Sequence, residues 1–577
     1  MEREWVEKAV DGAAVDALVS AGCAPLVARV LALRGVDPGG LSSFLDPSHH
    51  DLAAPSELPG IDAAVAVVMP FVRSRRRIVV FGDYDCDGVC ATAILVKTLE
   101  ALGASVSPFI PRRTDEGYGM TDASLARMKA ENPDASLVVT VDNGINAVEP
   151  VAALKAGGIS VVVTDHHLPG SELPAADALV NPKVSAPPRL ESLCGAGVAY
   201  MLARALVESA RRDTGDSSLA SGMSGRIFVM AGLATVTDIM PLLGQNRILV
   251  SEALRHFRSW APVGLRELYD RVARSGVQRM TSRDFGFMIG PRINAVGRIE
   301  GRFGTAMNAP LGLMLGTDRE KAREFARMVD ECSSVRKRYE QAMTDMAMKL
   351  VAPGAAGQVI YLDGSCESVH PGVAGIVASR VMERLEGACP VCVLVDGRGS
   401  ARAPAGYNLR DAFERCSEHL SRFGGHAVAA GLGVVAGHEK AFADSFAAAC
   451  AAQADAIPQA ERGVVGVDAF VEANDLTMGL AEELRRLEPF GEGNPEPVFA
   501  IRGACITEVR SLGAEGRHLA LAADGVRAVW WGRGDLADSL RADSAHPHDV
   551  LFSLDISTYQ QPHLELRLAG LRRSRDA

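Results

Sequence analysis

The sequence predicts an α/β protein that contains a parallel-sheet domain, a second and smaller α/β domain, and a C-terminal β-barrel. Continuous Val/Ile runs alternate with helix-like segments from Arg77 onward, which is typical of a parallel sheet covered by helices on both faces. A similar pattern returns from Gln358, after a long segment without proline. Short alternating segments near the C-terminus have the spacing of a small barrel.

The order of these patterns predicts the domain boundaries. Residues 1–70 are rich in Pro, Asp and Gly and contain short amphipathic stretches, so we expect a helical N-terminal lead-in. The parallel-sheet domain is expected over residues 71–310. Residues 311–352 lack proline and are rich in good helix formers, so they predict one long connecting helix. We expect the smaller α/β domain over residues 353–455 and the barrel domain over residues 456–577.

Acidic residues follow the strands of the predicted parallel sheet. Five aspartates stand directly after strand-like runs, in the motifs FGDYDCDG, TVDNG and TDHH: Asp83, Asp85, Asp87, Asp142 and Asp165. Parallel α/β sheets bind ligands beyond the carboxyl ends of their strands. We therefore expect these carboxylates in one crevice, together with the adjacent imidazoles of His166 and His167.

A crevice with so many carboxylates favours a metal centre. The carboxylates would repel one another strongly unless a multivalent cation neutralised them. Carboxylates combined with an imidazole suit Mn²⁺ or Mg²⁺ better than a structural zinc ion, which favours thiolates. Two such cations about 3.5–4 Å apart would activate water and hold a phosphoryl centre. A helix N-cap is the alternative for any single Asp at a strand end, but it does not explain the whole set.

The motifs GDYDCDG, VDNG, TDHH and the later TVTDIMPL resemble the four signature blocks of the DHH phosphoesterase superfamily, and in particular its bacterial single-strand-specific exonucleases. The match extends through RTDEGYGM, LCGAGVAY, GPRINAVGRI, VHPGVAGIVASR, FGGHAVAAGL and PFGEGNPEPVF. The resemblance implies a DHH catalytic domain, a smaller DHHA1 substrate-binding domain, and an OB-like domain that binds single strands.

The same resemblance implies a role for each residue of the metal centre. The implied ligands of two divalent cations are Asp83, Asp85, Asp87, Asp142, His166 and Asp238. Asp142 matches the ligand that bridges both cations, which makes it a catalytic residue as well. His167 matches the catalytic residue that faces the scissile phosphate as an acid or charge stabiliser. Asp165 is expected to orient His166 from behind.

Substrate contacts are implied on both α/β domains. The candidates are Arg113, Arg298, Ser400, Arg402, Gly425 and His426. Arg298, Ser400 and Arg402 match contacts to a terminal 5′-phosphate, for which the planar guanidinium is well suited. Arg113 matches a contact to the phosphodiester backbone of the strand near the scissile bond. A surface salt bridge is the alternative for each arginine, and a tight turn with a capping His is the alternative for the two residues of FGGHAVAAG.

The barrel domain contains aromatic residues that could stack on bases, as OB folds commonly do. These residues are Phe499, Trp530, Trp531 and Tyr559. Core packing is the competing role for most of them, and the local arginines are compatible with strand binding.

The overall charge restricts the function. The chain has 577 residues, with 60 Lys and Arg against 71 Asp and Glu, a net charge of -11. This acidic balance argues against a protein that coats nucleic acid through a basic surface. It leaves room for an enzyme whose positive charge is confined to one channel.

Together these observations predict a 5′-to-3′ exonuclease that degrades single-stranded DNA to 5′-mononucleotides by two-metal-ion hydrolysis, in DNA recombination and repair. One alternative is a DHH phosphodiesterase acting on oligoribonucleotides or cyclic dinucleotides, which the C-terminal barrel disfavours. Another is a catalytically dead replication scaffold, which the complete set of ligands disfavours.

The compartment and the partners are predicted from simpler features. The N-terminal segment has no continuous apolar run, and no stretch approaches the roughly 20 apolar residues that cross a bilayer. The 11 cysteines are scattered and odd in number, which favours a reduced, cytoplasmic protein. We expect a monomer, without a membrane partner, that is assisted by a helicase and a single-strand-binding protein.

Overall fold

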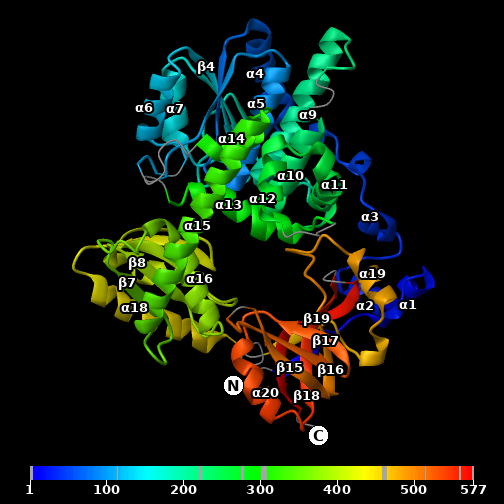
Figure 1. Ribbon diagram of the computed structural model, residues 1–577. Coiled ribbons are helices and arrows are strands. Elements are labelled where there is room, and N and C mark those ends of the chain that lie inside the picture. Colours follow the sequence, from blue (N-terminus) through cyan, green and yellow to red (C-terminus); the bar gives the residue numbers. More distant parts are fainter. Residues whose placement is uncertain are drawn as a thin grey trace.

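The computed structural model describes residues 4–113, 115–117, 119–219, 224–273, 279–299, 308–457, 464–513, 515–557 and 561–574. Figure 1 shows three bodies: a large α/β body, a smaller α/β body and a C-terminal β body beside which the N-terminal helices lie. This arrangement confirms the predicted fold class. No helix within the described ranges has both the length and the apolar character needed to span a membrane.

The large α/β body is built on a five-stranded sheet. Its strands are β2 (Arg77–Phe81), β3 (Val106–Phe109), β4 (Ala135–Val141), β5 (Ser160–Thr164) and β6 (Ala178–Val180). The sheet is parallel throughout, in the order β3-β2-β4-β5-β6. Its central strands are almost fully buried because helices cover both faces.

Alternate residues of each strand enter two different cores. The core on one face is closed by α4 (Ile61–Ser74), α5 (Cys86–Ala101), α9 (Gly195–Thr214) and α10 (Ser224–Thr237). The core on the other face is closed by α6 (Asp122–Glu131) and α7 (Val148–Ala156). The carboxyl ends of β2, β4 and β5 are thereby held side by side at one edge of this body.

Further helices complete the large body. They are α8 (Pro182–Ser185), α11 (Gly244–Trp260), α12 (Val263–Val272), a π-helix (Asp284–Ile289), α13 (Gly290–Val296) and α14 (Ala309–Leu315). The predicted connecting helix is α15 (Arg319–Lys349). It is shorter than expected at its N-terminus, because Asp318 caps it by accepting from the Lys321 N–H and Gly316 ends the preceding helix.

The smaller α/β body contains a mixed sheet in the order β10-β11-β9-β8-β7. Its strands are β7 (Gln358–Leu362), β8 (Val391–Val395), β9 (Arg398–Arg402), β10 (Leu420–Gly425) and β11 (Ala429–Val434). Its helices are α16 (Ala374–Arg384), α17 (Leu409–Arg415) and α18 (Glu439–Ala456). Only the β7–β8 pair is parallel among the described strands of this sheet, so this body differs in topology from the large one.

The C-terminal β body has seven strands in the order β13-β14-β18-β19-β17-β16-β15. They are β13 (Ala469–Phe470), β14 (Phe499–Ala504), β15 (Ile506–Leu512), β16 (His518–Ala523), β17 (Val526–Trp530), β18 (His548–Ser557) and β19 (His563–Arg573). Two helices accompany them, α19 (Met478–Arg485) and α20 (Ala537–Ala542).

The N-terminal segment packs against the C-terminal β body. It contains β1 (Glu4–Glu7), α1 (Gly12–Ser20), α2 (Pro25–Leu33) and α3 (Leu41–Leu45). β1 pairs in parallel with β12 (Val464–Val467), and Leu18, Leu31 and Phe44 share a core with the β body. The helices predicted for residues 1–70 are therefore present, and those before residue 46 join the far end of the chain (Figure 1).

The Gly/Pro-rich corner after α19 ties the β body to the large body. The Leu242 N–H donates to the Glu492 carbonyl over 2.8 Å, and the Ser282 hydroxyl donates to the Phe490 carbonyl over 2.6 Å. Arg247 is buried and donates to the carbonyls of Phe44, Leu487 and Glu488. These contacts place the corner directly beside the segment that follows Asp238.

Candidate active site

The sheet brings the predicted acidic residues together at the carboxyl ends of three strands. Asp83, Asp85 and Asp87 follow β2, Asp142 follows β4, and His166 follows β5. Asp238 comes directly after the C-terminus of α10. The six predicted ligands therefore converge from four elements. They are Asp83, Asp85, Asp87, Asp142, His166 and Asp238.

Distances within this cluster define three overlapping groups of ligand atoms. The ligand atoms of Asp83, Asp85 and Asp142 lie within 4.8 Å of one another, and so do those of Asp87, His166 and Asp238, and those of Asp142, His166 and His167. The His166 Nε2 lies 3.0 Å from the Asp142 Oδ1, and 3.6 Å from both the Asp87 Oδ2 and the Asp238 Oδ2. Asp142 thus lies between the group with Asp83 and Asp85 and the group with Asp87 and Asp238, where a bridging ligand would be needed.

The electrostatics of the cluster show that it fits divalent cations. Burial, followed by repulsion from neighbouring carboxylates, raises the pKa of Asp83 and of Asp142 well above the usual range. Burial and the nearby Asp87 raise the pKa of Asp238 to about 9. Among the described residues, the Asp142 Oδ1 and the Asp238 Oδ2 are buried oxygens without a hydrogen-bond donor. Cations would supply the missing partners and remove the repulsion.

Two further features match a pair of cations. Asp238 stands at the C-terminal end of α10, where the helix dipole is itself unfavourable for a carboxylate. Burial lowers the pKa of His166, so the ring stays neutral and its nitrogen lone pair remains available to a cation. The position of the Asp238 carboxylate is unfavourable without a cation, and both features favour binding of one.

Asp87 is anchored by the N-terminus of α9. Its two carboxylate oxygens accept the N–H groups of Gly195 and Ala196, each over 2.7 Å. A Cβ on Gly195 would lie 2.6 Å from the Asp142 side chain, so only glycine permits this close approach. This role of Gly195 was not predicted from the sequence, although the Gly-x-Gly at the start of a helix, within LCGAGVAY, is a signal for it.

The expected role of Asp165 is corrected by the structure. Its Oδ1 lies 2.7 Å from the Nδ1 of His167 and also accepts the N–H groups of His166 and His167, while its Oδ2 accepts the Ile145 N–H. Asp165 therefore orients the second imidazole rather than the first. Burial alone would lower the pKa of His167, but the hydrogen bond to Asp165 raises it to about 9.

Replacing Asp165 with Asn is expected to shift the pH dependence of catalysis downward. His167 is protonated below its pKa, which is about 9 without cations, so wild-type kcat/KM should fall as the pH rises through the lower pKa that His167 has when cations are bound. Asn retains the backbone contacts but lacks the charge, so this alkaline limb should move down by at least about one pH unit. The measurement is kcat/KM against pH at saturating Mn²⁺. Wild type and D165N are compared under the same conditions, because bound cations lower the pKa of His167 in both proteins. An unmoved limb in D165N would show that this pair does not set the pH dependence.

The predicted phosphate contacts meet where the smaller α/β body approaches the large one. A Cβ on Gly372 would lie 1.8 Å from the Arg298 carbonyl oxygen, and a Cβ on Gly375 would lie 2.8 Å from the Arg402 Nη2 and 3.3 Å from the Ser400 Oγ. Burial lowers the pKa of Arg402. The structure thus brings Arg298, Ser400 and Arg402 together around the start of α16.

Arg113 and Arg298 lie close to the metal centre. Burial, and then repulsion from Arg113 and Arg336, lower the pKa of Arg298 to about 10. The guanidinium of Arg113 stands over the ring of Tyr84, which lies between Asp83 and Asp85, at 5.3 Å from its centroid. Several positive groups thus gather beside an acidic cluster, an arrangement suited to a phosphate bound between them.

Comparisons with known proteins agree with this geometry. Family models match three parts of the chain: the DHH family N-terminal domain over residues 77–223, the DHHA1 domain over residues 356–452, and the RecJ OB domain over residues 467–569. The single-stranded-DNA-specific exonuclease RecJ of Dickeya dadantii is 38% identical over 493 residues, 82% of this chain and 83% of that protein. The chain belongs to the RecJ family.

Other RecJ proteins extend the comparison. RecJ of Bacillus subtilis is 32% identical over 506 residues, 86% of this chain, and the chain spans 61% of that relative's length. The crystal structure of Thermus thermophilus RecJ in complex with Mn²⁺ has a TM-score of 0.82 and 32% sequence identity, and the match covers 99% of this chain and 79% of that one. The Mg²⁺ complex of the same protein has a TM-score of 0.76 and 30% identity. The predicted superfamily and its three domain types are confirmed.

Two candidates of this RecJ-family chain lie apart from the metal centre. Gly425 and His426 are exposed at the tip of the β10–β11 hairpin, and the His426 N–H donates to the Ala429 carbonyl. No hydrogen bond or ion pair between described residues joins the His426 ring to the centre. The register places Gly425 opposite Ala430 and Ala430 opposite Ala401. Gly425 is therefore about 10 Å, two strand spacings, from the β9 residues around Arg402.

The aromatic candidates of the OB domain divide into core and surface residues. Phe499 is fully buried and packs near Phe552, so it belongs to the core. Trp530 is half-buried, with the Arg533 guanidinium 4.9 Å from its ring centroid. Trp531 is the most exposed of these three, at 53%, and its ring centroid lies 4.9 Å from that of His518. Tyr559 lies outside the described residues.

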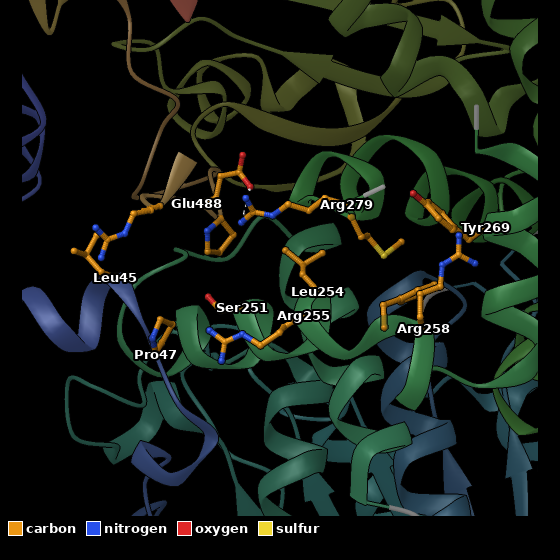
Figure 2. A pocket seen from close by; sticks show the side chains of 13 residues that line it. Leu45, Pro47, Ser251, Leu254, Arg255, Arg258, Tyr269, Arg279 and Glu488 are labelled. Carbon is orange, nitrogen blue, oxygen red and sulfur yellow. Dashed lines mark ion pairs between the residues drawn. The ribbon is translucent and has the colours of Figure 1, made fainter. Parts of the chain in front are cut away.

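A cavity of about 440 Å³ lies away from the metal centre, between α11, α12 and the chain after α19 (Figure 2). Four arginines line it, and three of them pair with carboxylates: Arg255 with Asp46 and Glu252, Arg258 with Asp270, and Arg279 with Glu488. Figure 2 shows Arg279 and Glu488 facing each other. This pairing neutralises most of the positive charge, and none of the predicted site residues lines the cavity.

Proposed function

We propose that this protein is a metal-dependent exonuclease that degrades single-stranded DNA from its 5′ end and releases 5′-mononucleotides. The observation that carries the proposal is the carboxylate–imidazole centre with an arginine-lined pocket directly beside it. The named RecJ relatives are single-stranded-DNA-specific exonucleases, and the Thermus RecJ structures contain Mn²⁺ or Mg²⁺.

The metal centre takes two divalent cations, Mn²⁺ or Mg²⁺, in this proposal. Asp83, Asp85 and Asp142 hold one cation, while Asp87, His166 and Asp238 hold the other. Asp142 serves both, because it lies between the two groups. When bound, the cations neutralise the carboxylates, acidify a water molecule and withdraw charge from the phosphate.

His167 is proposed to act on the substrate, next to the ligand atoms of Asp142 and His166, which lie within 4.8 Å of its own. Its Nδ1 lies 2.7 Å from Asp165, and the proposal places its Nε2 toward the scissile phosphate. The raised pKa keeps the ring protonated at neutral pH, so it can stabilise the negative charge of the transition state and donate a proton to the leaving oxygen.

The direction of degradation follows from where the positive charge lies. Arg298, Ser400 and Arg402 are proposed to bind the terminal 5′-phosphate, and Arg113 the strand near the cut. A phosphate clamped at this place puts the first phosphodiester beside the metal centre, which favours release of one nucleotide at a time. Gly425 and His426 are proposed to contact the strand from the hairpin of the DHHA1 domain.

The cellular setting is also proposed. We propose that the protein acts in DNA recombination and repair, as a monomer in the cytoplasm, with a helicase that unwinds duplex and a single-strand-binding protein that presents the strand. The acidic net charge is consistent with binding confined to a threaded single strand.

A labelled oligonucleotide with Mn²⁺ or Mg²⁺ tests the proposed function. A 5′ label is expected to appear at once as mononucleotide, while a 3′ label persists until late in the reaction. A blunt duplex of the same sequence should be degraded much more slowly. Release from the 3′ end first, equal attack on the duplex, or turnover of short oligoribonucleotides or cyclic dinucleotides alone would contradict the proposal.

A further inference from the structure

A second cavity opens beside the metal centre. Its volume is about 410 Å³, within the range of pockets that hold ligands of nucleotide size. Thr237, the neighbour of Asp238, and the predicted phosphate contact Arg298 line it together with Arg336. Ile376 of α16 and Phe490 of the Gly/Pro-rich corner complete it, so all three bodies contribute to its wall.

Two apolar side chains of this cavity are exposed to solvent. Phe287 is 75% exposed and Ile239 is 70% exposed, the two highest values among the exposed large hydrophobic residues of the described chain. Such exposure of an aromatic ring costs free energy in the absence of a ligand. Both residues line this cavity, so a ligand there would cover them.

The backbone at both positions is unusual. Phe287 lies in the π-helix Asp284–Ile289, a rare form that occurs frequently at functional sites. Ile239 has a φ of 57°, a left-handed conformation that a β-branched residue rarely adopts. Strain of this kind persists where function requires a side chain at a given place.

Phe287 also stands between two neighbouring cavities. The larger one, of about 670 Å³, lies between the π-helix and the OB domain and shares Ser282, Arg283 and Phe287 with the first. Arg567 of β19 lines its far side and pairs with Glu496 and Asp555, so its charge is largely neutralised. A strand passing from the OB domain to the metal centre through these cavities would meet Phe287 for its bases.

We propose that the cavity beside the metal centre is a base-binding subsite in which the Phe287 ring stacks on an unpaired base of the strand being degraded. Ile239 packs against the same base from the side of Asp238. A base in a duplex is stacked on its neighbours and paired, so it is not available to Phe287, and the subsite selects single strands. This inference rests on the proposed function, because it assigns the substrate to a strand of nucleic acid.

The first test measures stacking without cleavage. Oligonucleotides that carry 2-aminopurine at one position each, from the 5′ end inward, are bound to the full chain in the presence of a chelator. Fluorescence should be quenched at one internal position in wild type and at that position should recover in F287A, while F287W keeps the quench. Absence of a quench at every position, or an equal quench in F287A, would overturn the subsite. A quench without nucleotide release after Mn²⁺ is added would leave the subsite standing and contradict the proposed function.

The second test is a cycle between protein and substrate. An abasic nucleotide at the identified position should lower wild-type kcat/KM about tenfold, and F287A should lose about as much on the intact strand. The two changes together should lose little more than either one alone. If the fold-losses in kcat/KM caused by F287A and by the abasic nucleotide multiply when the two are combined, Phe287 acts on folding rather than on the base. L350A is the matched control, since Leu350 is 55% exposed at the end of α15 and does not line either cavity; it should behave as wild type.

Discussion

Replacing Asp142 with Asn is expected to lower kcat for nucleotide release at least about 10³-fold, since one change disturbs both ligand groups. Asp142 lies 3.0 Å from His166 and shares its other group with Asp83 and Asp85. The amide has nearly the same shape but lacks the negative charge that both cations need. Single-turnover release from a 5′-labelled strand at saturating Mn²⁺ measures the loss.

The same substitution lowers activity, but it is not expected to lower the stability of the metal-free protein. Burial and the surrounding carboxylates raise the pKa of Asp142 well above its usual range, so the folded chain binds this proton more tightly than the unfolded chain. Wild type without metal therefore loses stability as the pH rises above about 4, where the unfolded carboxyl ionises. Asn carries no charge to desolvate, so D142N should melt at a Tm equal to or above that of wild type at pH 7 with chelator present.

Thermal unfolding with and without Mn²⁺ separates these two effects. Wild type should gain Tm on binding the cations, by linkage, and D142N should gain much less. D134N is the matched control, because Asp134 is exposed and its carboxylate pairs with Arg77 among the described residues, so its activity and its gain in Tm should equal those of wild type. A D142N protein that keeps its activity would refute the bridging role. A lower Tm without metal would show that the carboxylate stabilises the empty site.

Replacing Arg402 with Ala is expected to lower kcat/KM about 100-fold on a 5′-phosphorylated strand and only a few-fold on a 5′-hydroxyl strand. Buried charge-assisted hydrogen bonds have free energies of this order, about 2–5 kcal/mol when one partner is removed. Arg402 meets Ser400 near the start of α16, and burial lowers its pKa, so its charge is held in place for an anionic ligand. Arg402→Lys should recover only part of the loss. Lys keeps the positive charge, but its ammonium group lacks the bidentate geometry of a guanidinium.

The control for this prediction is R410A in the same domain. Arg410 is exposed and pairs with Glu414 one helical turn away, so its removal should leave both substrates unaffected. The measurement is kcat/KM for four combinations, wild type or R402A with phosphate or hydroxyl at the 5′ end. Equal losses on both substrates would place Arg402 elsewhere in the mechanism, and no loss on either would remove it from the substrate pocket.

The metal centre was largely predictable because its residues lie in short motifs at the ends of strands. A Val-rich run predicts a buried parallel strand, and parallel strands present their carboxyl ends at one edge, so Asp83, Asp142 and His166 could be brought together without coordinates. Asp238 was harder, since it follows a helix, and only the resemblance to a known family assigned it. The DHHA1 and OB parts followed from the same resemblance.

Other features depended on contacts between residues far apart in the chain. The partner of Asp165 was predicted to be His166, but the turn after β5 directs the carboxylate to His167 instead. The anchoring of Asp87 by Gly195 joins residues more than 100 positions apart. Neither contact leaves a periodic signal in the sequence, because each depends on how two elements pack.

The sequence by itself determined the fold class and the family and proposed the six ligands, because strand and helix periodicity and the short motifs that carry the family resemblance are local properties. Only the tertiary structure decided that the N-terminal helices pack on the OB domain, that Arg298 and Arg402 meet across two bodies, and that Phe287 stays exposed beside the metal centre. These outcomes depend on the packing of whole bodies against one another. The exposed fraction of a side chain depends on which distant residues pack against it, and the local sequence does not determine this.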